Sequence, residues 1–315
     1  MWGAVLIVPL LLAAGHVPAA GERGGEMRQR AVIGRDSRLL AVQGVAVLPD
    51  GAVLVADRLD YRVKKFAASG EQRGAVGGRG KGPGLFQGPG PLDFRGNRIA
   101  VADFATGRVQ YLRDDFTPSL SFEVPGAVSD LCFDGTGNLW VMAVTMDKQR
   151  GLFLYGADGK ERKTLGLRNG EGDLFFDAGF VAWLGKGMIA VAYYLRNKIE
   201  LWDTSGRFIR EFAVPGLPDR AHTRRVSGSK SGTMVPDGNI VRSMTADGHG
   251  RLYVLGADYS LRPGEEVLEL DGEGRLQRRL WLREKSVLIR ADGKGSLYVV
   301  PGDRRSVVRY HLGEG

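Results

Sequence analysis

The chain has 315 residues, of which 43% are hydrophobic, so it is long enough to bury a sizeable core. Its net charge of +8 favours anionic partners, although a basic surface can also serve solubility alone. Glycine is unusually frequent, at 47 residues, but the glycines follow no Gly-X-Y period. This composition excludes collagen and indicates frequent turns between short strands.

The N-terminus carries an apolar run from Ala4 to Gly15, followed by small residues through Ala20. The run is shorter than a typical membrane-spanning helix, and cleavage after Ala19 or Ala20 is plausible. We therefore expect residues 1–20 to be a signal peptide and the mature protein to be secreted or periplasmic. An uncleaved membrane anchor is the alternative, because no Lys or Arg precedes the run. Residues 21–315 are expected to form a single monomeric domain without a stable membrane span.

A four-stranded unit recurs along the rest of the chain. Its first turn is marked in order by Asp50-Gly51, Gly96-Asn97, Asp134-Gly135, Gly185-Lys186, Asp247-Gly248 and Asp292-Gly293. Most intervals are about 40 to 50 residues, the length of one propeller blade. The strands that follow these turns lie at residues 52–57, 98–103, 138–144, 188–194, 251–257 and 296–302. They are rich in Val, Ile, Leu and aromatics, which predicts central strands buried on both faces.

The strand count predicts how the ring closes. The last unit ends at Leu312 without a fourth strand, whereas residues 28–34 precede the first unit and have no blade of their own. Pairing the two removes two exposed strand edges. The sequence therefore predicts an all-β, six-bladed β-propeller with four-stranded blades, closed by this N-terminal strand.

Two stretches resemble NHL repeats, namely residues 44–66 (GVAVLPDGAVLVADRLDYRVKKF) with 77–86 (GGRGKGPGLF), and residues 91–112 (PLDFRGNRIAVADFATGRVQYL). Later copies decay. The resemblance implies a six-bladed propeller but says little about function. It also implies a structural role for the repeated pairs Asp57 with Arg62 and Asp103 with Arg108, as ion pairs that brace the loop between the second and third strands. The alternative is a charged rim that captures ligand, although exposed pairs contribute little energy.

Three carboxylates, Asp93, Asp130 and Asp177, fall in or just before first strands and are expected to line the axis. They are candidates for acid–base chemistry, or for holding a divalent cation at the channel mouth. The alternative is that they only line a water-filled channel. We expect no other cofactor, and a three-histidine zinc site is disfavoured because His222, His249 and His311 lie on separate elements.

Two other features are expected to be structural. Cys132 is the only cysteine and lies in an apolar run, which favours a buried, inert thiol. The glycine-rich loop at residues 77–84 has no Ser or Thr after Lys81 and no following helix. It is therefore expected to connect two blades rather than to bind a nucleotide.

An insertion at residues 215–239 lengthens the connection between blades four and five. Propellers commonly bind ligands on this face because loops from every blade converge there, and arginine forks suit carboxylate, sulfate and phosphate groups. The candidate binding residues in and near the insertion are Arg220, His222, Arg224, Arg225, Lys230, Tyr193 and Arg196. A solvated loop is the alternative.

The sequence favours a non-enzymatic scaffold that binds a protein, a peptide or an anionic glycan through its loop face. A metal-assisted lyase or lactone hydrolase with carboxylates at the channel mouth is the alternative. Nucleic acid suits the positive charge but conflicts with export.

Overall fold

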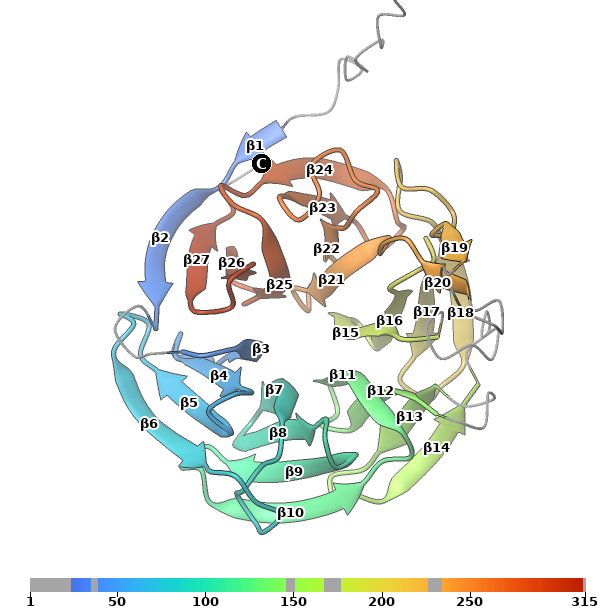
Figure 1. Cartoon of the computed structure of the whole chain (residues 1–315). Helices are drawn as coiled ribbons and strands as arrows, with labels where there is room; N and C mark the ends of the chain where they lie inside the picture. Colours follow the sequence, from blue (N-terminus) through green and yellow to red (C-terminus); the bar gives the residue numbers. More distant parts are fainter. Residues whose placement is uncertain (1–23, 35–38, 146–150, 167–176, 226–233, 314–315) are drawn as a thin grey trace, which may run out of the picture.

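The computed structural model describes residues 24–34, 39–145, 151–166, 177–225 and 234–313. Six antiparallel sheets stand around a central axis, as the sequence predicts (Figure 1). This part of the chain is all-β and forms no helix that is long and apolar enough to cross a membrane.

Blades 1 to 3 follow one another along the chain. Blade 1 contains β3 (Val42–Val47), β4 (Val53–Asp57), β5 (Arg62–Phe66) and β6 (Gln72–Gly77). Blade 2 contains β7 (Pro89–Arg95), β8 (Arg98–Asp103), β9 (Arg108–Arg113) and β10 (Pro118–Glu123). Blade 3 contains β11 (Ala127–Phe133), β12 (Leu139–Val144), β13 (Leu152–Tyr155) and β14 (Glu161–Leu165).

Blades 4 to 6 complete the ring. Blade 4 contains β15 (Gly179–Gly185), β16 (Met188–Tyr193), β17 (Ile199–Asp203) and β18 (Phe208–Phe212). Blade 5 contains β21 (Val241–Ala246), β22 (Leu252–Gly256), β23 (Glu266–Leu270) and β24 (Leu276–Trp281). Blade 6 contains β25 (Ser286–Ala291), β26 (Ser296–Pro301) and β27 (Val307–His311), with β2 (Arg28–Ile33) as its outermost strand.

The core lies between the blades. Each cluster of buried apolar side chains spans two neighbouring sheets, so both faces of a central strand are covered. Every residue of β4, β22 and β26 is buried, which explains why these strands are continuously apolar instead of alternating.

The predicted ring closure is confirmed. Strand β2 pairs antiparallel with β27, and Ile33 lies opposite Val307. Ile33 is fully buried between blades 6 and 1. One strand escaped the sequence analysis: β1 (Gly24–Glu26) adds a fifth, parallel strand to the outer edge of blade 5 (Figure 1). Its sequence, GGE, has no hydrophobic pattern that could reveal it.

Candidate ligand-binding site at the channel mouth

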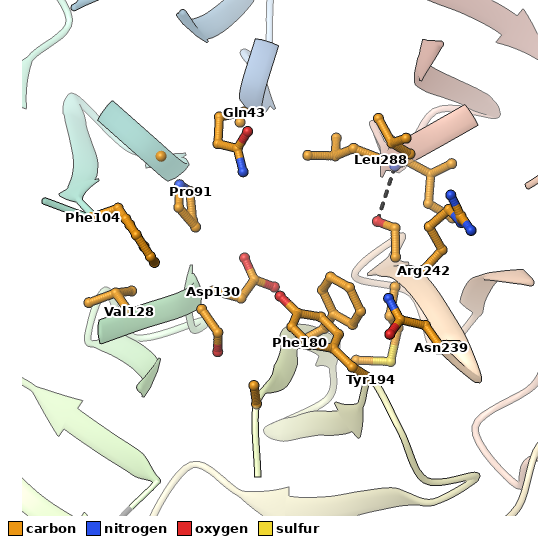
Figure 2. Close-up of a pocket in the computed structure, with 18 of the residues that line it drawn as sticks. Gln43, Pro91, Phe104, Val128, Asp130, Phe180, Tyr194, Asn239, Arg242 and Leu288 are labelled. Carbon is orange, nitrogen blue, oxygen red and sulfur yellow. Dashed lines mark hydrogen bonds between the residues drawn. The ribbon is translucent and has the colours of Figure 1, made fainter. Parts of the chain in front are cut away.

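A cavity of about 450 Å³ lies at one end of the axis. It is formed where the innermost strands begin and where the central strands end. This is the face that also carries the blade-to-blade connections, and we call it the loop face. Figure 2 shows side chains from all six blades directed toward this space.

Three arginines from different blades meet at this mouth. Arg58 directly follows β4, Arg242 lies in β21, and Arg304 lies in the loop after β26. Burial, together with the charges of Arg58 and Arg242, lowers the pKa of Arg304 below its ordinary value. Like charges so close together repel one another, and an anion among them would relieve that repulsion.

The negative charge at the mouth is smaller than the positive charge. Arg242 pairs with Asp258 at 3.0 Å, whereas Arg304 Nη1 donates to two neutral acceptors, Val42 O at 3.1 Å and Gln43 Oε1 at 2.9 Å. Arg58 forms no ion pair within the described residues, and its guanidinium lies 5.5 Å from the ring centre of Phe104.

Arg304 has a backbone φ of +59°, a left-handed conformation that non-glycine residues seldom adopt. Such conformations cost of order 1 kcal/mol and are concentrated at functional sites. Here the turn directs the guanidinium from blade 6 toward the start of blade 1.

Aromatic and aliphatic side chains form the other walls. Phe180 packs edge-to-face on Tyr194, with ring centres 4.7 Å apart, and Phe104, Pro91 and Leu288 line the same space (Figure 2). The cavity therefore combines guanidinium groups with apolar surface, which suits a ligand that carries both an anionic and an apolar group.

Asp130 places a carboxylate in the same cavity and points toward its centre in Figure 2. Its Oδ2 accepts a hydrogen bond from the backbone N–H of Val181 in blade 4, at 3.1 Å. Burial raises the pKa of Asp130 to about 6, although the charge of Arg290 partly opposes the shift.

Arg290, on β25, forms the floor of the cavity. Its Nε donates to Val45 O at 2.9 Å and its Nη2 to Leu92 O at 3.4 Å, so the side chain links blade 6 with blades 1 and 2. Arg290 also lines a smaller cavity of about 200 Å³ at the opposite end of the axis. The Arg290 guanidinium thus lies between the mouth cavity and the smaller cavity.

The three carboxylates expected on the axis do not converge. Asp93 lines the smaller cavity, where its Oδ2 accepts from Phe133 N at 2.8 Å. Asp177 pairs with Arg196 at 2.9 Å and does not line the mouth cavity, although its neighbour Ala178 does. The described residues include no group of three or more His, Cys, Asp or Glu side chains placed to hold a metal ion.

The insertion lies away from the axis. Its strands β19 (Thr223–Arg225) and β20 (Met234–Pro236) form a hairpin at the circumference of the ring, between blades 4 and 5 (Figure 1). Of the described residues of the insertion, Asn239 at its C-terminal end lines the mouth cavity, whereas the described hairpin residues do not. The insertion was expected to bind ligand on the loop face, but its hairpin does not contribute to the mouth cavity.

The predicted binding residues of the insertion contact their own neighbourhood. Arg224 Nε lies 3.3 Å from Asp237 Oδ1 within the hairpin, and the His222 ring packs on Tyr259 with centres 5.7 Å apart. Arg220 forms a backbone bridge to Arg196. Lys230 and the side chain of Arg225 lie outside the described residues.

Tyr193 and Arg196 are buried parts of blade 4 instead of exposed binding groups. The Tyr193 hydroxyl donates to Glu200 Oε1 at 2.8 Å, and the Arg196 guanidinium lies 4.0 Å from the centre of the Tyr193 ring. Because successive side chains of a strand point to opposite faces, the next residue, Tyr194, reaches the cavity in place of Tyr193.

The first repeat pair has partners other than those expected. Asp57 is fully buried and bonds to Lys64 Nζ at 2.9 Å and to the backbone N–H groups of Leu40 and Ala41. Arg62 pairs with Asp60 at 3.0 Å and not with Asp57. Asp57 thereby stabilises the connection that leads from blade 6 into β3 of blade 1.

The second pair is formed, although loosely. Arg108 Nη2 lies 3.7 Å from Asp103 Oδ2, which also accepts from Gln87 N at 2.9 Å. Asp103 thus holds the connection from blade 1 to blade 2, the counterpart of the role of Asp57.

Cys132 and the glycine-rich segment at residues 77–84 are structural features, as the sequence predicts. Cys132 is buried, and that burial raises the pKa of its thiol well above the ordinary value. The glycine-rich segment connects β6 to β7, and Gln110 of blade 2 bonds to Gly84 N and Leu85 O within that connection.

Apart from Asp130, the sequence analysis did not identify the arginines and aromatic residues that surround the mouth, although the sequence contains a signal for some of them. The position immediately after the central strand carries Arg58 in blade 1, Phe104 in blade 2 and Tyr194 in blade 4, and all three line the cavity. Aligning the repeats on that position would have revealed part of the site.

Comparisons with known proteins support the fold alone. No protein-family model and no curated protein matches the sequence. A solved structure of streptogramin B lyase is 12% identical with a TM-score of 0.59, and the match covers 91% of this chain and 98% of that one. A protein of Bacteroides fragilis named as an exported protein is 12% identical with a TM-score of 0.60, over 90% of this chain and 94% of that one. Hydrazine synthase of Kuenenia stuttgartiensis is 11% identical with a TM-score of 0.59, over 87% and 96%.

Proposed function

We propose that this protein is a non-enzymatic, exported binding propeller that captures an anionic ligand in the mouth cavity. The observation that carries the proposal is the convergence of Arg58, Arg242 and Arg304 from three blades around one cavity, where Asp258 is the one carboxylate that pairs with them among the described residues. Guanidinium groups bind carboxylate and phosphate oxygens through parallel hydrogen bonds, and each such charged contact contributes about 1.5–3 kcal/mol.

The walls narrow the class of ligand. Phe104, Phe180 and Tyr194 offer apolar faces next to the arginines, so an organic anion fits the cavity better than an inorganic one. An acidic peptide or an anionic glycan that inserts one residue would meet this requirement. Export, and membership of the NHL family, belong to the same proposal and are supported by the N-terminal segment and by the repeats of blades 1 and 2.

Thermal unfolding in the presence of small anions tests the proposal. Glucuronate, hexanoate and benzoate are compared with the neutral analogues glucose, hexanol and benzyl alcohol. A ligand at about one hundred times its Kd stabilises the folded state by about 2.7 kcal/mol, which raises Tm by several degrees. We expect at least one anion, and no neutral analogue, to do so.

Two variants locate the site. Arg304→Ala should abolish the shift in Tm, whereas Arg305→Ala should retain it, because Arg305 is the exposed neighbour outside the cavity lining. Equal shifts with neutral analogues, or a shift that survives Arg304→Ala, would refute capture by the arginines.

One observation favours catalysis as a second candidate. Asp130 lines the same cavity and has a pKa raised by burial to about 6, which is suitable for a general acid or base near neutral pH. If the mouth is catalytic, any anion that binds should be converted by the wild-type protein but not by Asp130→Asn. Proton NMR of the incubated ligand, with and without added Ca²⁺, Mg²⁺ or Zn²⁺, distinguishes conversion from binding.

A further inference from the structure

Four exposed apolar side chains gather on the loop face over blades 1 and 2. Leu40 is 48% exposed, Leu59 59%, Leu85 37% and Phe104 50%. They come from four separate segments, two blade connections and two loops after central strands. We call these four residues the blade 1–2 patch. Exposed apolar groups scattered singly are ordinary, but a contiguous set on one face marks an interaction surface.

Backbone bonds hold the inner half of the patch together. The Leu40 N–H donates to Asp57, and the Arg58 N–H donates to Ala41 O at 2.9 Å. Arg58 thus contacts both segments of this half, because its backbone bonds to the residue after Leu40 and its guanidinium lies over the Phe104 ring.

The outer half is joined in the same way. The Gly78 N–H donates to Tyr61 O, so the connection that carries Leu85 lies against the loop that carries Leu59. Arg79 then lies 5.8 Å from the ring centre of Tyr61.

The patch is bordered by positive charge. Arg58, Arg79 and Lys81 are exposed around it. The nearby carboxylates are neutralised or hidden: Asp57 is fully buried, and Asp60 is held by Lys64 and Arg62. A partner for this surface therefore needs apolar side chains together with carboxylates.

We propose that the blade 1–2 patch docks an extended acidic segment of a partner protein, whose apolar side chains pack on the patch and whose carboxylate reaches the mouth arginines. The proposal rests on the proposed function, because Phe104 belongs both to the patch and to the cavity, and Arg58, which borders the patch, also lines the cavity. An extended chain can follow the surface into the cavity, whereas a flat membrane surface cannot.

Fluorescence anisotropy with a labelled peptide of alternating Glu and Leu tests the proposal. Peptides of alternating Glu and Ser and of alternating Lys and Leu separate the acidic from the apolar requirement. We expect only the Glu–Leu peptide to bind tightly. Leu59→Glu should weaken its binding about tenfold or more, because it places a carboxylate on an apolar contact and opposite the carboxylates of the peptide.

Leu261→Glu is the matched control, since Leu261 is 65% exposed on the same face but in blade 5, outside the patch. Equal weakening by both leucine variants, or equal binding of the Glu–Ser peptide, would overturn the proposal. Binding to phosphatidylglycerol vesicles that Leu59→Glu abolishes, without any peptide binding, would identify a membrane surface instead.

The small-anion assay keeps the two proposals separable. Leu59→Glu should retain the anion-induced rise in Tm, because Leu59 does not line the cavity. If the wild-type protein shows that rise but binds no Glu–Leu peptide, patch docking alone is contradicted. If the wild-type protein shows neither, the proposed function is contradicted.

Discussion

Replacing Asp130 with Asn tests whether the buried carboxylate at the mouth destabilises the folded state. The asparagine Oδ1 can still accept the hydrogen bond from Val181 N, so the link between blades 3 and 4 is preserved. Only the charge is removed. Burial raises the pKa of Asp130 from 3.8 to about 6, so the folded state binds its proton more tightly than the unfolded chain does.

The sign of the effect follows from this shift. Between the unfolded and folded pKa values the folded protein carries more protons, so its stability falls as the pH rises from about 3.8 to about 6. Above about pH 6 the full cost is present. Two pKa units correspond to about 3 kcal/mol. We therefore expect Asp130→Asn to stabilise the protein by about 1–3 kcal/mol at neutral pH and by little near pH 4.

Urea unfolding of both proteins at about pH 7.5 and about pH 4.5 measures the difference. Carboxylates remote from Asp130 titrate equally in both and cancel. Asp93 does not, because its charge raises the pKa of Asp130 and the two groups titrate together, so the measured difference includes the change at Asp93. A variant that is less stable at neutral pH, or a stability difference that is the same at both pH values, would refute the reasoning.

Three further predictions concern the ring. Truncating the chain to begin at Gly34 removes β2 and leaves β27 as an open edge; we expect loss of cooperative melting and self-association by size-exclusion chromatography, whereas a chain that begins at residue 21 should melt normally. Asp57→Ala leaves the buried Lys64 ammonium and two backbone N–H groups without this acceptor, and should lower the free energy of unfolding in urea by about 3 kcal/mol. Glu71→Ala removes an exposed ion pair and should lower it by less than about 0.5 kcal/mol. Equal losses would contradict a stabilising role of Asp57 in the connection between the blades. Gly44→Ala places Cβ 2.3 Å from Gly90 O and should lower the free energy of unfolding by about 1–3 kcal/mol. Gly90→Ala, whose new Cβ has its nearest contact at 3.6 Å, should leave stability almost unchanged. Similar melting temperatures of the two variants would show that the inner strands can separate.

The fold could be predicted because its signals are local and repeated. Each central strand is a short apolar run after a glycine turn, and both faces of that run are buried in every blade. Ring closure followed from a missing strand at one end and a surplus strand at the other. Strand β1 could not be predicted, since the three residues GGE carry no apolar pattern.

The site was harder to predict than the fold, because it depends on the direction in which single side chains point. Arg58 and Arg304 follow central strands of blades that lie next to each other only after closure, so their sequence separation hides the contact. Tyr193 and Tyr194 are adjacent in sequence, but one is buried and the other lines the cavity. The insertion misled because its arginines are dense in sequence while the fold places its hairpin at the circumference.

The axial carboxylates become informative when they are compared with the other blades. In blade 5, Ser243 Oγ accepts from Ile289 N at 3.1 Å and Thr245 Oγ1 from Ala291 N at 3.2 Å, which is the same link to the next blade that Asp130 makes. A neutral hydroxyl therefore suffices for the link. Because a buried charge is costly where a neutral group would serve, the carboxylate of Asp130 is better explained by the cavity that it lines than by the contact that it makes.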